Sequence, residues 1–339
     1  MPEMLDAFEG DAFEFTTLTA SVNNEPFVPG QVGALGIFEE EGVTTTDLAI
    51  EERAGALELV GESARGGPGE TIEKDVEKVR KLPIPHFQRE EGIAAEEVQG
   101  RRAFGTADAR ETLEGRIVQR SMRHFRDFDA TLEYQRIGAL KGVILNKAGG
   151  VRTNLFTEFG VTQESTVYLD LSNATPASGF LRDACDTVIE TIEDNLTGTP
   201  YSHVHCLAGR TAYKKVFKHK EVVDSYKNTV EAAFLRQGLP RTFTFGDITF
   251  ERYRTGGTVN FIGDDDLHFF PMGASGLFIT RFAPADYNDT VNTVGLPRYL
   301  RVFATNNNKG YKLEVQTNPI SLCLKPKVLI KGSAGADPG

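Results

Sequence analysis

The feature that most constrains this chain is a long stretch with helical periodicity. No proline interrupts residues 86–175, and inside them apolar side chains recur mostly every three to five residues, as on one face of a helix. Thr106 fits the N-cap position, and Gly142 fits the stop. About 35 residues rising about 1.5 Å each give a helix roughly 50 Å long. That is long for a compact domain and predicts a spine. Its apolar positions are Leu113, Ile117, Met122, Phe125, Phe128, Leu132, Ile137 and Leu140.

The segment before this helix, residues 35–99, is strongly acidic, with 16 Asp and Glu against 7 Lys and Arg. Strand-like stretches at 46–60 and 75–88 flank a tip rich in glycine, which predicts one long hairpin. A lone two-stranded hairpin is marginal in water and has two open edges. We therefore expect the hairpin to pack on a protein surface, either in this subunit or in a neighbouring one. The alternative is a disordered acidic insertion.

The remaining chain mixes helices and strands, so the predicted fold class is α+β. One helix has an apolar stripe of Leu181, Cys185, Val188, Ile192 and Leu196, which places Cys185 in the core. The expected elements are a hairpin at 143–161, this helix at 178–198, a strand at 201–208, helices at 209–228 and 231–239, hairpins at 242–253 and 258–273, and two or three strands at 297–330.

Composition limits the function. The net charge of −11 argues against a globally basic nucleic-acid binder. The three cysteines Cys185, Cys206 and Cys323 are odd in number and widely spaced, which indicates reduced thiols in a cytosolic setting. The start of the chain does not look like a signal peptide, and no apolar run is long enough to span a membrane. The 339 residues suggest two or three domains, or one elaborated domain.

The stretch YSHVHCLAG, residues 201–209, is the main candidate metal site, and the acidic turn at 263–266 could hold magnesium. On a strand, His203 and His205 share a face while Cys206 takes the other, so Cys206 cannot join the two histidines. A zinc site needs a third ligand, and often a fourth. The candidates are His219, His268 and the acidic residues in 263–266, although such histidines are more often structural, and three Asp in a turn are more often solvated.

No catalytic motif occurs in the sequence. It has neither of the glycine-rich phosphate-binding patterns, no nucleophile elbow and no His-Glu-x-x-His. This absence favours a structural or assembly protein.

The last third of the chain, from LHFFPMG through FAPADYND to NNNKGYKLEVQTNPISLCLKP, resembles the lambda-type major capsid proteins of tailed bacteriophages, the phage capsid protein E family. The helix RIVQRSMRHFRDFDATLEYQRIGALKG resembles the same family, and the resemblance covers most of residues 30–332. It implies a Hong Kong 97-type fold. The implied parts are an N-terminal arm at 1–34, an extended loop at 35–92, a peripheral domain with the spine helix at 93–170 and 291–332, an axial domain at 171–290, and a tail at 333–339.

The resemblance implies a major capsid protein that assembles as pentamers and hexamers into an icosahedral head shell around double-stranded DNA, not an enzyme, with no cofactor and no metal. The extended loop would contact neighbouring subunits. Its candidate interface residues are Arg53, Glu58, Arg65, Lys74, Lys78 and Arg80.

The spine helix is the candidate for contact with DNA. Residues 101–147 hold 10 basic and 6 acidic side chains, and a solvated helix face is the usual reason for such charge. In a DNA-filled shell, Arg116, Arg120 and Arg123 would instead face the lumen and neutralise phosphates non-specifically.

The implied partners are other copies of the chain, a scaffolding protein in trans, a portal, and a decoration or cement protein, with no membrane. Scaffolding in trans is expected because only about 30 residues precede the extended loop. The implied location is the virion, and the host cytoplasm during assembly. Lys74, Lys78 and Lys81 are not expected to cross-link. The alternatives are a nanocompartment shell of the same fold and a metal-dependent hydrolase at His203 and His205.

Overall fold

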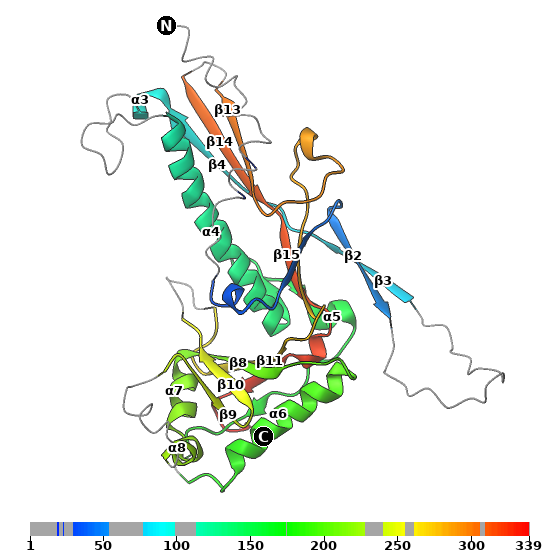
Figure 1. The fold of residues 1–339 in the computed structure, drawn as a ribbon, viewed down its shortest axis with the longest axis vertical. Helices are drawn as coiled ribbons and strands as arrows, with labels where there is room; N and C mark the ends of the chain where they lie inside the picture. Colours follow the sequence, from blue (N-terminus) through cyan, green and yellow to red (C-terminus); the bar gives the residue numbers. More distant parts are fainter. Residues whose placement is uncertain are drawn as a thin grey trace, which may run out of the picture.

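The structure is a computed structural model. It describes residues 19, 23, 30–53, 77–98, 113–173, 175–227, 240–254, 261–305 and 309–338. Figure 1 shows an elongated molecule with two halves. A long helix runs beside narrow sheets in the upper half, and a broader sheet with helices forms the lower half. This arrangement fits the expectation of a spine.

The spine is helix α4 (Leu113–Lys141). It ends where predicted, because Gly142 adopts a φ of +76°, which L side chains rarely adopt. The predicted N-cap Thr106 lies outside the described residues. The apolar face is confirmed where side chains are described, although Met122 is only partly buried. The buried members are Ile117, Phe125, Phe128, Leu132, Ile137 and Leu140.

Two small sheets accompany the spine. The first has the antiparallel order β13-β14-β4 and packs on α4 through a cluster that includes Ile93, Ile117, Phe125 and Leu313. The second has the order β1-β12-β15, with β1 parallel to β12. Their strands are β4 (Phe87–Ala94), β13 (Tyr299–Ala304), β14 (Gly310–Thr317), β1 (Glu39–Gly42), β12 (Phe278–Phe282) and β15 (Pro319–Cys323).

The lower half is built on a six-stranded sheet of order β7-β16-β11-β8-β10-β9. Phe250 and Phe269 pack edge to face inside it, and Tyr213 of α7 packs on Phe243, so α7 covers that face. The elements are β7 (Val167–Tyr168), β8 (His203–Ala208), β9 (Thr242–Phe245), β10 (Ile248–Arg252), β11 (Asp266–Met272), β16 (Ile330–Ser333), α6 (Phe180–Leu196), α7 (Arg210–Lys218) and α8 (Lys220–Lys227).

Most local predictions are confirmed. The stripe of α6, including Cys185, is buried as expected. Gly246 and Asp247 both have a φ of +54°, the conformation of a tight two-residue turn, and join β9 to β10. The hairpin expected at 143–161 is confirmed in its first part, where β5 (Val143–Leu145) pairs with β6 (Val151–Asn154), but residues 155–159 form the helix α5 (Leu155–Phe159) instead of a strand. The remaining short elements are α3 (Ala95–Val98), η2 (Gly33–Leu35), η3 (Asn288–Thr290) and η4 (Pro326–Val328).

Three local predictions are wrong. The helix expected at 209–228 breaks at His219, whose ψ of 139° is not helical, and gives α7 and α8. The hairpin expected at 258–273 is one strand in its described part, because β11 already has β8 and β16 on its two edges. The strand expected at 75–88 is divided between two sheets, since Pro83 and Pro85 lack the N–H that a continuous ladder needs. The helix expected at 231–239 lies outside the described residues.

Strand pairing crosses the implied domain boundaries. The strand β16 comes from the segment assigned to the peripheral domain or tail, yet it pairs with β11 in the lower sheet. The strand β12 comes from the segment assigned to the axial domain, yet it pairs with β15 in the upper half. The division into arm, loop, peripheral and axial parts stays a prediction. Among the described residues, no helix has the length and apolarity to cross a membrane.

Candidate assembly surfaces

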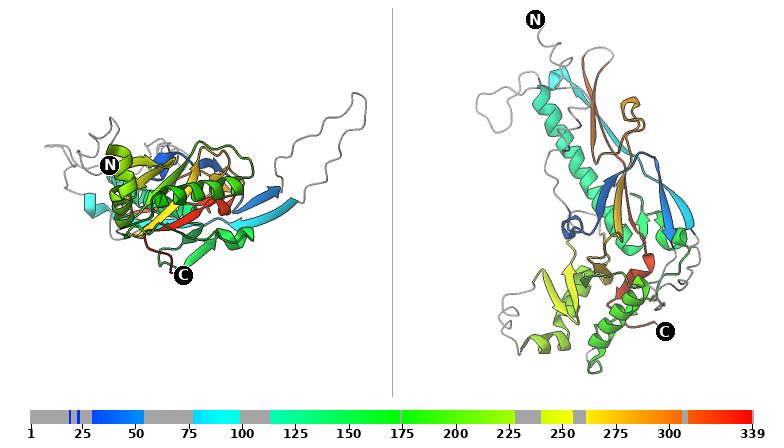
Figure 2. Two further views of the ribbon diagram at one scale, coloured as in Figure 1. Left: turned by 90° about the horizontal axis from the view of Figure 1, so that it is seen from below. Right: turned by 45° about the vertical axis from the view of Figure 1, so that its right-hand side comes forward.

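The hairpin of β2 (Asp47–Arg53) and β3 (Glu77–Pro83) projects from the body of the subunit (Figure 1 and Figure 2, left). Its two strands pair antiparallel with each other, and in the described part of the chain no third strand joins them. Leu48 and Leu82 are buried in the main core, whereas Val79 is 60% exposed. The hairpin is therefore rooted in its own subunit at the base and presents apolar surface further out.

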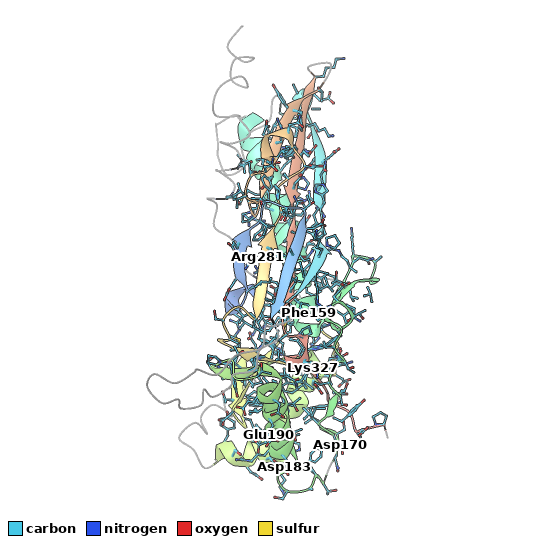
Figure 3. All side chains as sticks on the ribbon, turned by 90° about the vertical axis from the view of Figure 1, so that its right-hand side faces the viewer. Phe159, Asp170, Asp183, Glu190, Arg281 and Lys327 are labelled. Carbon is cyan, nitrogen blue, oxygen red and sulfur yellow. The ribbon has the colours of Figure 1, made fainter. Side chains whose placement is uncertain are left out.

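Arg80 holds the base of this hairpin. Its guanidinium donates hydrogen bonds to the carbonyl oxygens of Glu158 and Phe159, the latter at 3.0 Å, and lies 5.7 Å from the centre of the Phe159 ring. Phe159, labelled in Figure 3, ends α5 near the junction of the two halves. Arg80 thus makes contacts within its own subunit, which charge alone did not reveal.

The other predicted loop residues are placed only in part. Arg53 lies opposite Glu77, and Lys78 lies opposite Glu52, at the end of the paired region. They lie at the opposite end of the described strands from Leu48 and Leu82, which anchor the hairpin in the core. The candidates Glu58, Arg65 and Lys74 lie outside the described residues.

Arg120 of the spine is engaged in a local ion network. Its guanidinium lies 2.5 Å from Glu91 Oε1 and also contacts Glu97, and its side chain is 17% exposed. His124 Nε2 lies 2.7 Å from the other oxygen of Glu91. A hydrogen bond from the backbone N–H of Ala94, together with Arg120, lowers the pKa of Glu97. The network connects α4 to β4 and α3, so Arg120 stabilises the packing of these elements.

A groove of about 700 Å³ runs along the same helix. Arg116 contributes to it, is partly buried, and donates to Gln119 Oε1 at 3.1 Å. Arg123 and Arg126 are exposed. Arg126 was not among the predicted residues, although its spacing of three from Arg123 places it on the same helical face. The charge available to a partner is therefore concentrated on Arg123 and Arg126.

The histidine strand β8 is central in the lower sheet, and its two layers are as predicted. His203 is exposed, His205 is 4% exposed with its ring centre 6.3 Å from that of His203, and Cys206 is fully buried. His205 Nε2 lies 3.1 Å from Glu251 Oε2. Burial raises the pKa of Glu251, but hydrogen bonds from His205 and Gln31 outweigh it and leave the pKa below its usual value.

The predicted third and fourth ligands do not gather around these histidines among the described residues. In the described parts of the chain, no three His, Cys, Asp or Glu side chains gather as metal ligands. The acidic turn at 263–266 makes other contacts. The Asp265 carboxylate lies 3.1 Å from Lys215 Nζ, and the backbone carbonyl of Asp264 accepts hydrogen bonds from the first N–H groups of α7. His203 and His205 are thus a surface and a core histidine.

A buried contact that the sequence did not indicate joins the two halves. Glu133 of α4 is 6% exposed and accepts hydrogen bonds from the backbone N–H groups of Val32 at 2.7 Å and Gly33 at 3.0 Å. Gln31 donates to Glu251 Oε1 at 2.7 Å and accepts from the N–H of Arg254 at 2.9 Å. Residues 30–33 therefore connect the spine to the lower sheet, and we refer to them as the clasp. Its partners lie about 100 to 220 residues away along the chain, so no local pattern could reveal it.

The architecture is found in known structures. The structure superposes on the putative capsid protein of an Escherichia coli CFT073 prophage with a TM-score of 0.57 and 12% identity, covering 94% of this chain and 98% of that one. It also superposes on the capsid protein of cyanophage P-SCSP1u with a TM-score of 0.50 and 12% identity, covering 88% and 86%. The fold is the α+β fold of phage capsid proteins.

The sequence then defines the family. The model of the phage major capsid protein E family matches residues 14–334, and the chain belongs to that family. It is 28% identical to the major capsid protein of Pseudomonas phage KPP10, covering 95% of this chain and 97% of that protein. It is 24% identical to the major capsid protein of Salmonella phage Felix O1, covering 99% and 100%. The predicted resemblance is confirmed.

Family membership settles the class of function. The chain is a structural, shell-forming major capsid protein of a phage, and it is not an enzyme. The nanocompartment and hydrolase alternatives are not favoured. Its place is the virion.

Proposed function

We propose that this protein assembles as pentamers and hexamers into an icosahedral head shell that encloses double-stranded DNA. The observation that carries the proposal is the projecting hairpin. Two strands with open edges and exposed apolar surface gain stability when a neighbour covers them. A closed shell requires such contacts to repeat around symmetry axes between unlike surfaces of identical copies.

The hairpin is the part of the subunit that we expect to reach the neighbour. Arg80 and the buried Leu48 and Leu82 fix its base, so its direction is set before assembly. Arg53, Glu58, Arg65, Lys74 and Lys78 would supply polar contacts further out. The proposal also includes a scaffolding protein in trans, a portal, a decoration or cement protein, assembly in the host cytoplasm, and the division into arm, loop, peripheral and axial domains.

Val79→Asp tests the hairpin contact. Burying an unpaired carboxylate in an interface costs at least about 1–3 kcal/mol per contact, so shell yield should fall by roughly tenfold or more. Electron microscopy of the full chain, expressed with its scaffolding protein, measures the yield of shells. Val151→Asp is the matched control, because Val151 is 63% exposed on the other hairpin. Normal shells from Val79→Asp would contradict the hairpin contact.

Contact with packaged DNA is the second part of the proposal. Arg116, Arg120 and Arg123 were the predicted DNA-facing residues, but Arg120 is bound to Glu91 and Glu97. Exposed guanidinium groups release counterions when they meet phosphates, which favours Arg123 together with Arg126.

Arg123→Gln combined with Arg126→Gln tests this contact. Shells should form normally, while the amount of DNA retained after a salt wash should fall, since each lost phosphate contact weakens binding more as salt rises. Quantifying DNA per shell measures the effect, with Arg210→Gln on the exposed start of α7 as the control. Unchanged DNA retention in the double variant would contradict the proposed DNA contact.

A further inference from the structure

A cavity at the junction of α7 and α8 has no part in the surfaces described above. Its volume is about 440 Å³, within the range of roughly 300–1,000 Å³ that small-molecule sites occupy. The two helices form one wall, and the loop that contains Leu171 and Pro176 forms the other. We refer to it as the α7–α8 pocket.

His219 is the unusual residue of this pocket. It joins α7 to α8, lines the pocket and is 6% exposed, and both ring nitrogens are buried without a hydrogen-bond partner in the described chain. Buried polar atoms are nearly always paired, so two such atoms on one ring call for a partner. The backbone of His219 is satisfied, since its N–H donates to Val216 O and its carbonyl accepts from Val223 N, both at 3.0 Å. Only the imidazole ring lacks a partner, and in either protonation state it carries at least one N–H donor.

The charge around His219 is positive. Lys215, Lys218 and Lys220 line the pocket, against the single carboxylate of Asp224 among the described lining residues. Lys215 is already held by Asp265 at 3.1 Å. Lys218 and Lys220 are exposed, and the structure describes no ion pair for either. The N-terminal end of α8 at Lys220 carries partial positive charge and the C-terminal end of α7 at Lys218 carries partial negative charge, so the helix ends offset each other and the lysine side chains decide the sign. The pocket therefore combines a buried donor with two available cations.

We propose that the α7–α8 pocket binds a phosphate-bearing anion. His219 donates to a phosphate oxygen, while Lys218 and Lys220 neutralise its charge. Among the described lining residues, no aromatic side chain other than this imidazole offers a face on which a nucleobase could stack. Recognition is therefore of the phosphate group, and the pocket has room for more than one, as in pyrophosphate.

Pyrophosphate is the probe that tests the pocket. Calorimetry on the full unassembled chain, at fixed ionic strength because salt screens such contacts, should detect one site. His219→Leu should weaken binding at least tenfold. If His219 were only a core residue, this change would remove two unpaired polar atoms and leave stability equal or higher. The unfolding midpoint of the variant, measured in parallel, shows whether it is folded.

The exposed lysines provide a second variant that does not disturb the core. Lys218→Gln combined with Lys220→Gln should also lose at least tenfold in affinity, and Lys214→Gln, on α7 but outside the lining, should bind as the unchanged chain does. The proposal is overturned if the unchanged chain does not bind pyrophosphate, if His219→Leu folds and binds equally well, or if Lys214→Gln loses as much as the double variant. Competition by duplex DNA would identify nucleic acid as the source of the phosphate, and its absence would indicate a free anion.

Discussion

At the scale of single residues, one buried histidine sets how the stability of the folded subunit depends on pH. His268 of β11 is 7% exposed, and burial, followed by the nearby charges of Lys141 and Lys331, lowers its pKa to about 3. A histidine in an unfolded chain has a pKa of about 6.5. The folded chain therefore holds fewer protons than the unfolded chain between these values, so stability is full above about pH 6.5 and falls as the pH decreases below it.

His268→Phe tests this pH dependence. The variant keeps a ring of similar size without a titrating nitrogen. Between pH 7.5 and pH 5.0 the unchanged subunit should lose about 2 kcal/mol more stability than the variant, because the unfolded histidine takes up a proton that the folded one does not. Urea unfolding of the unassembled subunit at pH 7.5 and pH 5.0 measures the difference. An equal loss in both proteins would contradict the assignment to His268.

At the scale of elements, the end of the spine depends on one glycine. Gly142 combines a φ of +76° with a close approach, since a Cβ there would lie 2.3 Å from the ring of Phe156. The bend it makes sends the chain from α4 into the β5–β6 hairpin. The sequence predicted the stop, but only the packing of α5 explains why no other residue fits.

Gly142→Ala should therefore cost more than backbone strain alone. Gly149 is the matched control, because its φ is +85° and a Cβ there meets nothing within 4 Å. We expect Gly149→Ala to lose about 1–2 kcal/mol from the left-handed backbone, and Gly142→Ala to lose about 1–3 kcal/mol beyond that from overpacking. Urea unfolding of both variants measures the difference. Equal losses would show that Phe156 moves aside without cost.

At the scale of the whole molecule, the clasp determines how the two halves are joined. Glu133 links residues 30–33 to the spine, and Gln31 links them to Glu251 and to the backbone of the lower sheet. A Cβ at Gly30 would lie 2.2 Å from Glu133 Cδ, so the carboxylate also requires a glycine there. The connection passes through buried and partly buried hydrogen bonds, and the members of such a network support one another.

Glu133→Ala tests the clasp. It leaves the N–H groups of Val32 and Gly33 without their acceptor, and it should cost about 2–3 kcal/mol. Glu190→Ala is the control, because Glu190 lies exposed on the outer face of α6 (Figure 3). Chemical unfolding gives the stability, and limited proteolysis should cleave near residue 30 faster in the variant. Unchanged stability and unchanged proteolysis would show that the clasp does not hold the halves together.

Local patterns in the sequence were enough for much of the molecule. The spine, its apolar face, the stripe of α6, the hairpin turn at Gly246 and the split of His205 from Cys206 all follow from periodicity, which acts between near neighbours. The family followed from the order of motifs. Errors came where tertiary partners decide: His219 interrupts a helical pattern, and β11 takes β8 and β16 as neighbours in place of a preceding strand.

The sequence by itself determined an acidic, α+β chain organised along a long helix, with a hairpin that needs a surface to lie on. The tertiary structure alone decided which charged side chains are engaged inside the subunit and which can contact a partner. It binds Arg120 into a network with Glu91 and Glu97, roots Arg80 in its own subunit, and leaves the ring of His219 buried beside exposed lysines. The physical reason is that a charge acquires its role from partners brought together by folding, and the partners of Arg120 and Arg80 lie 23 to 79 residues away along the chain.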